Sequence, residues 1–146
     1  MTDKNYRLSR HATPHRGDIK TVAVLTDQVF ATGSRDKSAI LHPNNETTQH
    51  SAFVNSSCFH QGTLYSAGSS KSILPSILHA HSDNICHLSS YNNYLLSSSW
   101  DCSIKLWKDL VLVRSFTGHK AAVWSSICLD ENRLISASAD RTIKVY

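Results

Sequence analysis

Short runs in which apolar and polar side chains alternate recur along the chain, and turn-forming residues separate them. The clearest pair, residues 94–99 and 103–107, flanks a tight turn centred on Asp101. A further run, 110–116, follows a Lys-Asp turn and is ended by Thr-Gly-His. Alternation with a period of two between turn signals predicts β-strands. We therefore expect an all-β chain built from short strands.

Apolar side chains lie on both faces of these predicted strands. In the run 103–107, Ile104 and Leu106 face one way, whereas Trp107 faces the other. A strand that is apolar on both faces has to be covered on both, because each face would otherwise be exposed to water. The pattern therefore predicts several small sheets stacked face to face.

The same pattern repeats along the chain with a period of about 39 residues. The segment SSSWDCSIKLW at 97–107 returns as SASADRTIKVY at 136–146. In both copies a histidine comes about 20 residues before the turn aspartate, and an aromatic residue follows that aspartate. A first copy keeps this order with His15, Asp36 and, in the aromatic position, His42. A second copy, from Phe53, is expected to lack both the histidine and the aspartate.

Small sheets that repeat at this period are typical of a WD-repeat β-propeller, and about four blades are present. The predicted blade units are 12–52, 53–79, 80–116 and 117–146, with 5–11 as a candidate closing strand. Repeats of this kind usually close as rings of about seven or eight blades. We therefore favour part of a larger ring, followed by a two-chain ring of eight blades and then a closed four-blade ring. Exposed apolar blade faces predict self-association.

The repeated aspartate has an architectural explanation. In WD repeats the turn aspartate accepts hydrogen bonds from its own turn and from the preceding histidine. That histidine is linked through a strand Ser or Thr to the Trp indole, and the network compensates the burial of a carboxylate. Either Ser97 or Ser99 suits the third copy, and either Ser136 or Ser138 suits the fourth, where Tyr146 takes the Trp position. The predicted network residues are His15, Asp36, His81, Ser99, Asp101, Trp107, His119, Ser138 and Asp140.

Composition and charge exclude several function classes. The net charge is +4 without a run of basic residues, so no nucleic-acid partner is expected. No segment approaches the ~18 consecutive apolar residues of a membrane helix, and the N-terminus lacks the apolar core of a signal peptide. The four cysteines are spread singly and are expected to be reduced. These features predict a cytoplasmic or nuclear protein, or one found in both compartments.

Candidate chemistry is weak. Nine histidines suggest a metal site, with His79 and His81 as the obvious pair, but His81 already has an architectural position. No further ligands lie at a convincing spacing, so neither a metal nor a cofactor is expected. Residues 34–37 match Ser-x-x-Lys, yet they fall in a strand and turn rather than at the helix start that this nucleophile requires. The chain is predicted not to be an enzyme.

The loop face of the propeller is the expected interaction surface. The residue before each turn aspartate should point outward there, and the start of each first strand should lie near the central channel. Exposed Trp and Arg are the residue types that most often anchor protein interfaces. Alternatively, Trp124 packs against its neighbouring blade and the Trp100 ring simply lies on the surface. The candidate partner-binding residues are Asp18, Lys20, Arg35, Asn84, Cys86, Trp100 and Trp124.

Across nearly its whole length the chain resembles the N-terminal propeller of the phospholipase-activating-protein family, the ubiquitin-fusion-degradation adaptors. The resemblance rests on NYRLSRHATPHRGDIK at 5–20, SSSWDCSIKLWK at 97–108 and GHKAAVWSS at 118–126. It implies ubiquitin binding on the loop face, and a role in delivering ubiquitylated proteins to a valosin-containing-protein-type AAA ATPase and in maintaining free ubiquitin. Family members hold the ATPase through a separate helical domain, so its binding by this chain itself is not expected.

Two other functions remain open at this point. WD repeats alone would equally support a general protein-interaction scaffold whose partner is not ubiquitin. An RNA-associated propeller rests only on the basic pI of about 9.0, and it would require binding with a steep salt dependence.

Overall fold

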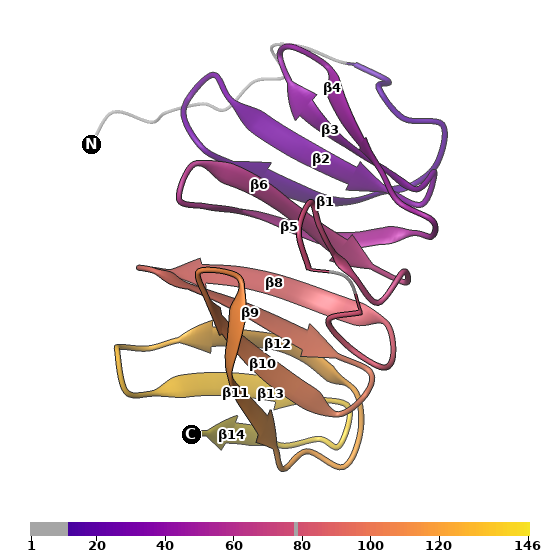
Figure 1. The fold of residues 1–146 in the computed structure, drawn as a ribbon. Coiled ribbons are helices and arrows are strands. Elements are labelled where there is room, and N and C mark those ends of the chain that lie inside the picture. The colour runs from indigo at the N-terminus through magenta and orange to yellow at the C-terminus, as the bar shows by residue number, and fades with distance from the viewer. Residues whose placement is uncertain (1–11, 78) are drawn as a thin grey trace, which may run out of the picture.

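The computed structural model describes residues 12–77 and 79–146, which form four antiparallel sheets and no helix (Figure 1). Sheet 1 contains β1 (Ile19–Val24), β2 (Phe30–Ser34), β3 (Ser38–His42) and β4 (Glu46–Gln49). Sheet 2 contains β5 (Val54–His60), β6 (Thr63–Gly68) and β7 (Ile73–Leu74). Sheet 3 contains β8 (Ile85–Tyr91), β9 (Tyr94–Ser99), β10 (Ser103–Lys108) and β11 (Val111–Thr117). Sheet 4 contains β12 (Val123–Cys128), β13 (Leu134–Ser138) and β14 (Ile143–Val145).

The four sheets are stacked in chain order, and each is a meander of hairpins (Figure 1). The first strands of successive sheets, β1, β5, β8 and β12, pack against one another in turn. This arrangement confirms the predicted all-β fold and is that of a partial propeller. The candidate closing strand at 5–11 lies outside the described residues. No helix in the described part of the chain has the length and apolar character needed to cross a membrane.

The core lies between the sheets rather than within one layer. One cluster, between sheets 2 and 3, includes Leu88, Leu95 and Trp107. A second, between sheets 3 and 4, includes Leu96 and Ile104, both fully buried. Complete burial of such a side chain contributes about 1.5–3 kcal/mol. Sheet 3 is therefore apolar on both faces and covered on both, as its sequence predicts.

A tight turn between the second and third strands recurs in all four sheets. The residue after the aspartate position has a left-handed backbone, with φ of 74° at Lys37, 64° at Lys71 and 67° at Cys102 and Arg141. This conformation costs a non-glycine residue about 1–2 kcal/mol. In sheets 1, 3 and 4 the aspartate accepts a hydrogen bond from the backbone N–H two residues later. These bonds offset the cost and hold the turn.

Candidate protein-interaction face

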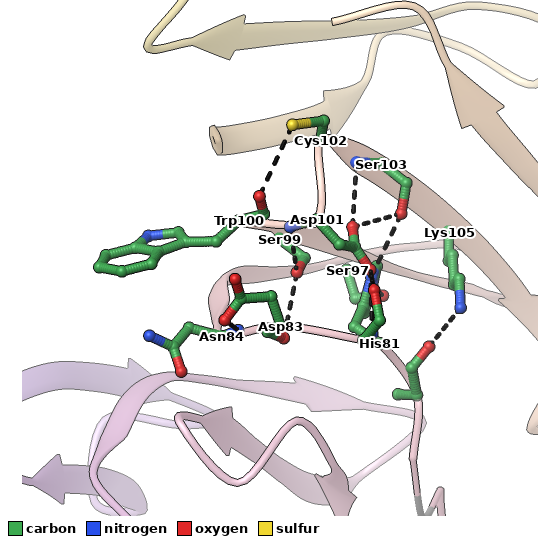
Figure 2. Close-up of polar contacts among 12 residues, drawn as sticks. His81, Asp83, Asn84, Ser97, Ser99, Trp100, Asp101, Cys102, Ser103 and Lys105 are labelled. Carbon is green, nitrogen blue, oxygen red and sulfur yellow. Dashed lines mark hydrogen bonds and ion pairs between the residues drawn. The ribbon is translucent and has the colours of Figure 1, made fainter. Parts of the chain in front are cut away.

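An aspartate-centred network holds the turn between β9 and β10 (Figure 2). His81 Nδ1 lies 2.8 Å from Asp101 Oδ2, and His81 Nε2 lies 2.7 Å from Ser97 Oγ. The indole N–H of Trp107 donates to the same serine oxygen at 2.9 Å. Asp101 also accepts hydrogen bonds from the backbone N–H and the hydroxyl of Ser103. The network thus joins a loop, two strands and a turn.

One set of proton positions satisfies every member of this network. The indole of Trp107 is only a donor, so Ser97 Oγ accepts from it and gives its own proton to His81 Nε2. His81 Nδ1 then carries the proton that it donates to Asp101 Oδ2. Burial opposes ionisation of Asp101, but hydrogen bonds from His81 and Ser103 outweigh it and hold the pKa of the carboxyl well below its usual range. Asp101 is therefore a structural anion.

The same network holds the corresponding turn of sheet 1. His15 Nδ1 lies 3.0 Å from Asp36 Oδ2, and His15 Nε2 lies 2.8 Å from Thr32 Oγ1. His42 Nε2 lies 3.0 Å from that threonine hydroxyl, so an imidazole stands where sheet 3 has an indole.

Sheet 4 has a shorter version. His119 lies 2.8 Å from both Asp140 Oδ2 and Ser136 Oγ. The ring of Tyr146 occupies the aromatic position and packs with the core, but its buried hydroxyl has no hydrogen-bond partner among the described residues. The hydrogen-bond chain therefore stops at Ser136.

Two serine assignments from the sequence are corrected here. The serines bonded to the histidines are Ser97 and Ser136, not Ser99 and Ser138. On each strand the two candidate serines lie on the same face, but Ser99 and Ser138 are two residues closer to the turn than Ser97 and Ser136. At that point their hydroxyls accept the backbone N–H of Asp101 and Asp140, each at 3.1 Å.

The expectation that the second copy lacks the histidine is also wrong. His50 Nε2 lies 2.7 Å from Ser66 Oγ, and His50 Nδ1 lies 3.3 Å from Ser70 Oγ. His50 therefore fills the histidine position, and a serine stands where the other sheets have aspartate. Burial lowers the pKa of His50 to about 4.

A bulge near the start of the first strand recurs in every sheet and shapes the loop face. The strand pairing is shifted between Ile19 and Thr21, and again at the same point of β5, β8 and β12. The extra residue of a bulge is left out of the regular pairing, so its side chain is re-aimed. The four bulged residues are Lys20, Asn55, Cys86 and Trp124.

The residue before each turn aspartate is fixed by a second repeated contact. Its backbone N–H donates to a carbonyl in the loop before the first strand, as Trp100 does to Asn84 at 2.9 Å. Arg35 and Ser69 make the same bond to Asp18 and Phe53, each at 2.9 Å. These bonds bring each pre-aspartate residue beside the bulge of its own sheet.

Together these repeated positions line one hollow of about 480 Å³ on the loop face. Each lining residue belongs to one of three kinds. It is a bulged residue, the residue before the turn aspartate (or before Ser70 in sheet 2), or the loop residue whose carbonyl accepts the backbone N–H of that residue. The lining residues are Lys20, Arg35, Phe53, Asn55, Ser69, Asn84, Cys86, Trp100 and Trp124.

The hollow combines exposed aromatic rings with positive charge. Trp100 is 46% exposed and Trp124 is 51% exposed, and their rings meet edge to face with centroids 6.1 Å apart. Arg35 lies over the ring of Phe53 at 5.8 Å. Burial raises the pKa of the Cys86 thiol to about 11, so the thiol is protonated at neutral pH and is a poor nucleophile. The hollow therefore combines aromatic surface and positive charge with an unreactive thiol.

The structure brings six of the seven candidate partner-binding residues into this hollow. The seventh, Asp18, lies at its edge and forms an exposed ion pair of 3.3 Å with Arg35. Sequence reasoning missed Phe53, Asn55 and Ser69, because the second copy was considered worn. Across residues 12–77 and 79–146, no group of three or more His, Cys, Asp or Glu side chains is placed to hold a metal ion.

Comparison with known proteins places this geometry in a family. The model of the "WD domain, G-beta repeat" matches residues 72–108 and 110–146, together about half of the chain. The chain belongs to the WD-repeat family. The two matched segments contain the network of sheet 3, from His81 to Trp107, and that of sheet 4, from His119 to Tyr146.

Relatives in other organisms confirm the resemblance to the phospholipase-activating-protein family. The chain is 27% identical to the ubiquitin fusion degradation protein 3 homolog of Caenorhabditis elegans, over 97% of this chain and 20% of that protein. It is 29% identical to protein DOA1 of Saccharomyces cerevisiae and 31% identical to phospholipase A-2-activating protein of Xenopus laevis, over 83% and 90% of this chain and 20% of each relative. The chain therefore spans about a fifth of the length of these relatives.

Solved structures agree with the fold. The WD40 β-propeller domain of Doa1 superposes with a TM-score of 0.86 at 29% identity, over 97% of this chain and 55% of that one. The computationally designed Ika4 protein superposes with a TM-score of 0.77 at 20% identity, over 90% of this chain and 92% of that one. The second likeness shows the fold alone.

Proposed function

We propose that the hollow on the loop face binds ubiquitin, and that this WD-repeat chain serves as a non-catalytic scaffold in ubiquitin-dependent degradation and ubiquitin homeostasis. Two relatives carry such roles in their names, ubiquitin fusion degradation protein 3 homolog and ubiquitin homeostasis protein lub1. The proposal extends to an adaptor role in the pathway of a valosin-containing-protein-type AAA ATPase. The described sheets themselves are not proposed to bind the ATPase.

The observation that carries the proposal is the convergence of Trp100, Trp124 and Arg35 on one hollow. Aromatic and Arg side chains are enriched among residues that dominate binding energy, particularly when a partner excludes water from them. The two Trp rings already touch each other, so little side-chain entropy is lost when a partner covers them. Lys20 and Arg35 add positive charge at one side. This surface suits a protein that presents a small apolar patch.

The test is a titration of isotope-labelled ubiquitin with the unlabelled chain, read from the amide spectrum of ubiquitin. We expect saturable shifts confined to one surface of ubiquitin. The double variant Trp100→Ala with Arg35→Glu should weaken binding at least about 30-fold, since removal of one interface Trp commonly costs 2 kcal/mol or more. Val111→Ala is the control, because it truncates an exposed apolar side chain on the outer strand β11, away from the hollow.

Three outcomes separate the readings. Shifts that vanish in the double variant but persist in Val111→Ala support the proposed site. Shifts that persist in the double variant would show that ubiquitin binds elsewhere on the chain. An absence of shifts with a folded chain would reject ubiquitin as the partner, and a pull-down that still depends on Trp100 would then favour a scaffold for a different protein.

A further inference from the structure

A recurrent set of donors surrounds the turn aspartate in sheets 1, 3 and 4. One carboxylate oxygen accepts hydrogen bonds from Nδ1 of the histidine and from the backbone N–H of the residue after that histidine. The other oxygen accepts from the backbone N–H and the hydroxyl of the residue two positions after the aspartate. We call each set an anion cradle. The donor residues are His15, Arg16 and Ser38 in sheet 1, His81, Ser82 and Ser103 in sheet 3, and His119, Lys120 and Thr142 in sheet 4.

Sheet 2 repeats the backbone of this cradle around Ser70, which stands in the aspartate position. His50 precedes Ser70 by 20 residues, the same interval that separates the histidine from the aspartate in sheet 3. Lys71 has the left-handed backbone found after each turn aspartate, with φ of 64°. The N–H groups of Ser51 and Ser72 therefore occupy the positions whose equivalents donate to the carboxylate in the other sheets.

A serine cannot satisfy these donors as an aspartate does. Ser70 Oγ lies 3.3 Å from His50 Nδ1, whereas the carboxylate oxygens of the other sheets lie 2.8 or 3.0 Å from their histidines. A serine also has one uncharged oxygen where a carboxylate has two charged ones. Among residues 12–77 and 79–146, no protein acceptor is bonded to the N–H of Ser51 or of Ser72. The Ser72 hydroxyl is already used, because it accepts the N–H of His79 at 3.1 Å and contacts the carbonyl of Ser70 at 3.4 Å.

We propose that the cradle of sheet 2 binds a free, singly charged oxyanion of carboxylate size, held by the N–H groups of Ser51 and Ser72 and by Nδ1 of His50. Backbone N–H groups that converge at a turn bind anions, and the histidine adds a third donor. The cradle is open to solvent, since the aspartate side chains in its three equivalents are 10% or 17% exposed and Ser51 lies on the surface. The exposed Lys71 adds positive charge beside it.

A bound anion changes the ionisation of His50. This side chain is 3% exposed, and burial lowers its pKa to about 4. An opposite charge within about 4–6 Å stabilises the imidazolium and raises such a pKa by about 1–3. The same turn contains Ser69, which lines the hollow, so an anion in the cradle also steadies one wall of the interaction face.

The experiment is an NMR titration of the isotope-labelled chain with sodium nitrate, a planar oxyanion that stays ionised at every pH used. We expect saturable shifts of the Ser51 and Ser72 amides, with a dissociation constant below about 100 mM. The pKa of His50 should rise to about 5 or higher in saturating nitrate. The amides of Ser82 and Ser103 are the internal control, because a carboxylate already occupies their cradle.

Two variants at Ser70 separate the charge of the side chain from its size. Ser70→Asp places a carboxylate in the cradle, so it should raise the pKa of His50 without nitrate and abolish the response to nitrate. Ser70→Asn has the same size without the charge, and it should leave the pKa of His50 near 4. Circular dichroism checks that each variant is folded.

Each result decides the inference. Ser51 and Ser72 amides that do not move in about 0.5 M nitrate would overturn it, even if Ser70→Asp raises the pKa of His50, because the cradle would then accept only a carboxylate attached to the turn. Equal shifts at Ser82 and Ser103, or shifts that persist in Ser70→Asp, would place the anion elsewhere and overturn it too. A Ser70→Asp chain that fails to fold would contradict the likeness to the other cradles. None of these readings depends on ubiquitin binding.

Discussion

Replacement of Asp101 by Ala should remove the strongest polar constraint in sheet 3. The carboxylate accepts hydrogen bonds from His81, from the N–H of Ser82, and from the N–H and hydroxyl of Ser103. His81 and Ser103 are only 4% and 7% exposed, so water cannot replace the partner they lose, whereas the exposed Ser82 regains water.

The expected loss follows from these contacts. A hydrogen bond to a charged group contributes about 1.5–3 kcal/mol, and two of the donors lie on buried side chains. Relief of the desolvated carboxylate offsets part of this, so we expect a net loss of about 3–4 kcal/mol. For a chain of this size that corresponds to a fall of about 10 °C in Tm.

The assay is urea denaturation followed by far-ultraviolet circular dichroism, with all variants at the same chain concentration. Asp27→Ala is the matched control, since it removes the same charge from an exposed turn. An Asp101→Ala variant within about 0.5 kcal/mol of this control would refute the network as a source of stability.

The dependence of stability on acid pH tests the role of Asp101 independently. The pKa of Asp101 is lowered in the folded chain, so its contribution is fully present above the unfolded value of about 3.9 and is lost as the pH falls below it. The variant should therefore lose less stability than the unaltered chain between about pH 5 and pH 2. If both proteins lost the same free energy of unfolding between about pH 5 and pH 2, Asp101 would not be the stabilising anion.

Three further predictions concern other sheets. Gly68→Ala should lower the free energy of unfolding by about 1–3 kcal/mol in the same assay, because the added Cβ would lie 2.0 Å from the carbonyl oxygen of Phe53. Gly62→Ala is the control, since it has open space around it and should cost only about 1 kcal/mol for its φ of 76°. Cys58 is partly buried and its pKa is raised to about 12, so it should react with a thiol reagent far more slowly in the folded than in the unfolded chain; rapid labelling of Cys58 itself in the native chain, located by mass spectrometry, would contradict this. His50, with its pKa lowered to about 4, should show no imidazole titration by NMR between pH 8 and pH 5, and stability should fall as pH drops below the unfolded value of about 6.5.

The features that the sequence predicts well are those expressed locally. The strands on either side of Asp101, its role in the turn and the double-faced burial of sheet 3 all follow from alternation and spacing within about 15 residues. The exposure of Trp100 follows similarly, because a residue in a polar tight turn has little apolar surface to cover it.

The features that were missed depend on relations between strands. Ser97 and Ser99 lie on one face of one strand, so alternation cannot distinguish them, and the decision comes from the register that sets Trp107 opposite Leu95. A bulge is likewise a property of pairing, so Asn55 gave no signal of its own. His50 was recoverable, because it precedes Ser70 by the same interval that separates His81 from Asp101.

The recurrent bulge separates the side chains that line the hollow from the regular pairing of the strands. Lys20, Asn55, Cys86 and Trp124 stand outside the regular pairing of their strands, and together they form much of one hollow. Asn55 also joins sheets 2 and 3, because its side-chain amide donates to the carbonyl of Ile85 at 3.1 Å. Exchange of Lys20, Cys86 and Trp124 alters charge, shape and aromatic content at the hollow while the ladders keep their contacts. A library varied only at Lys20, Cys86 and Trp124 should therefore yield hollows with new binding specificities on an unchanged framework.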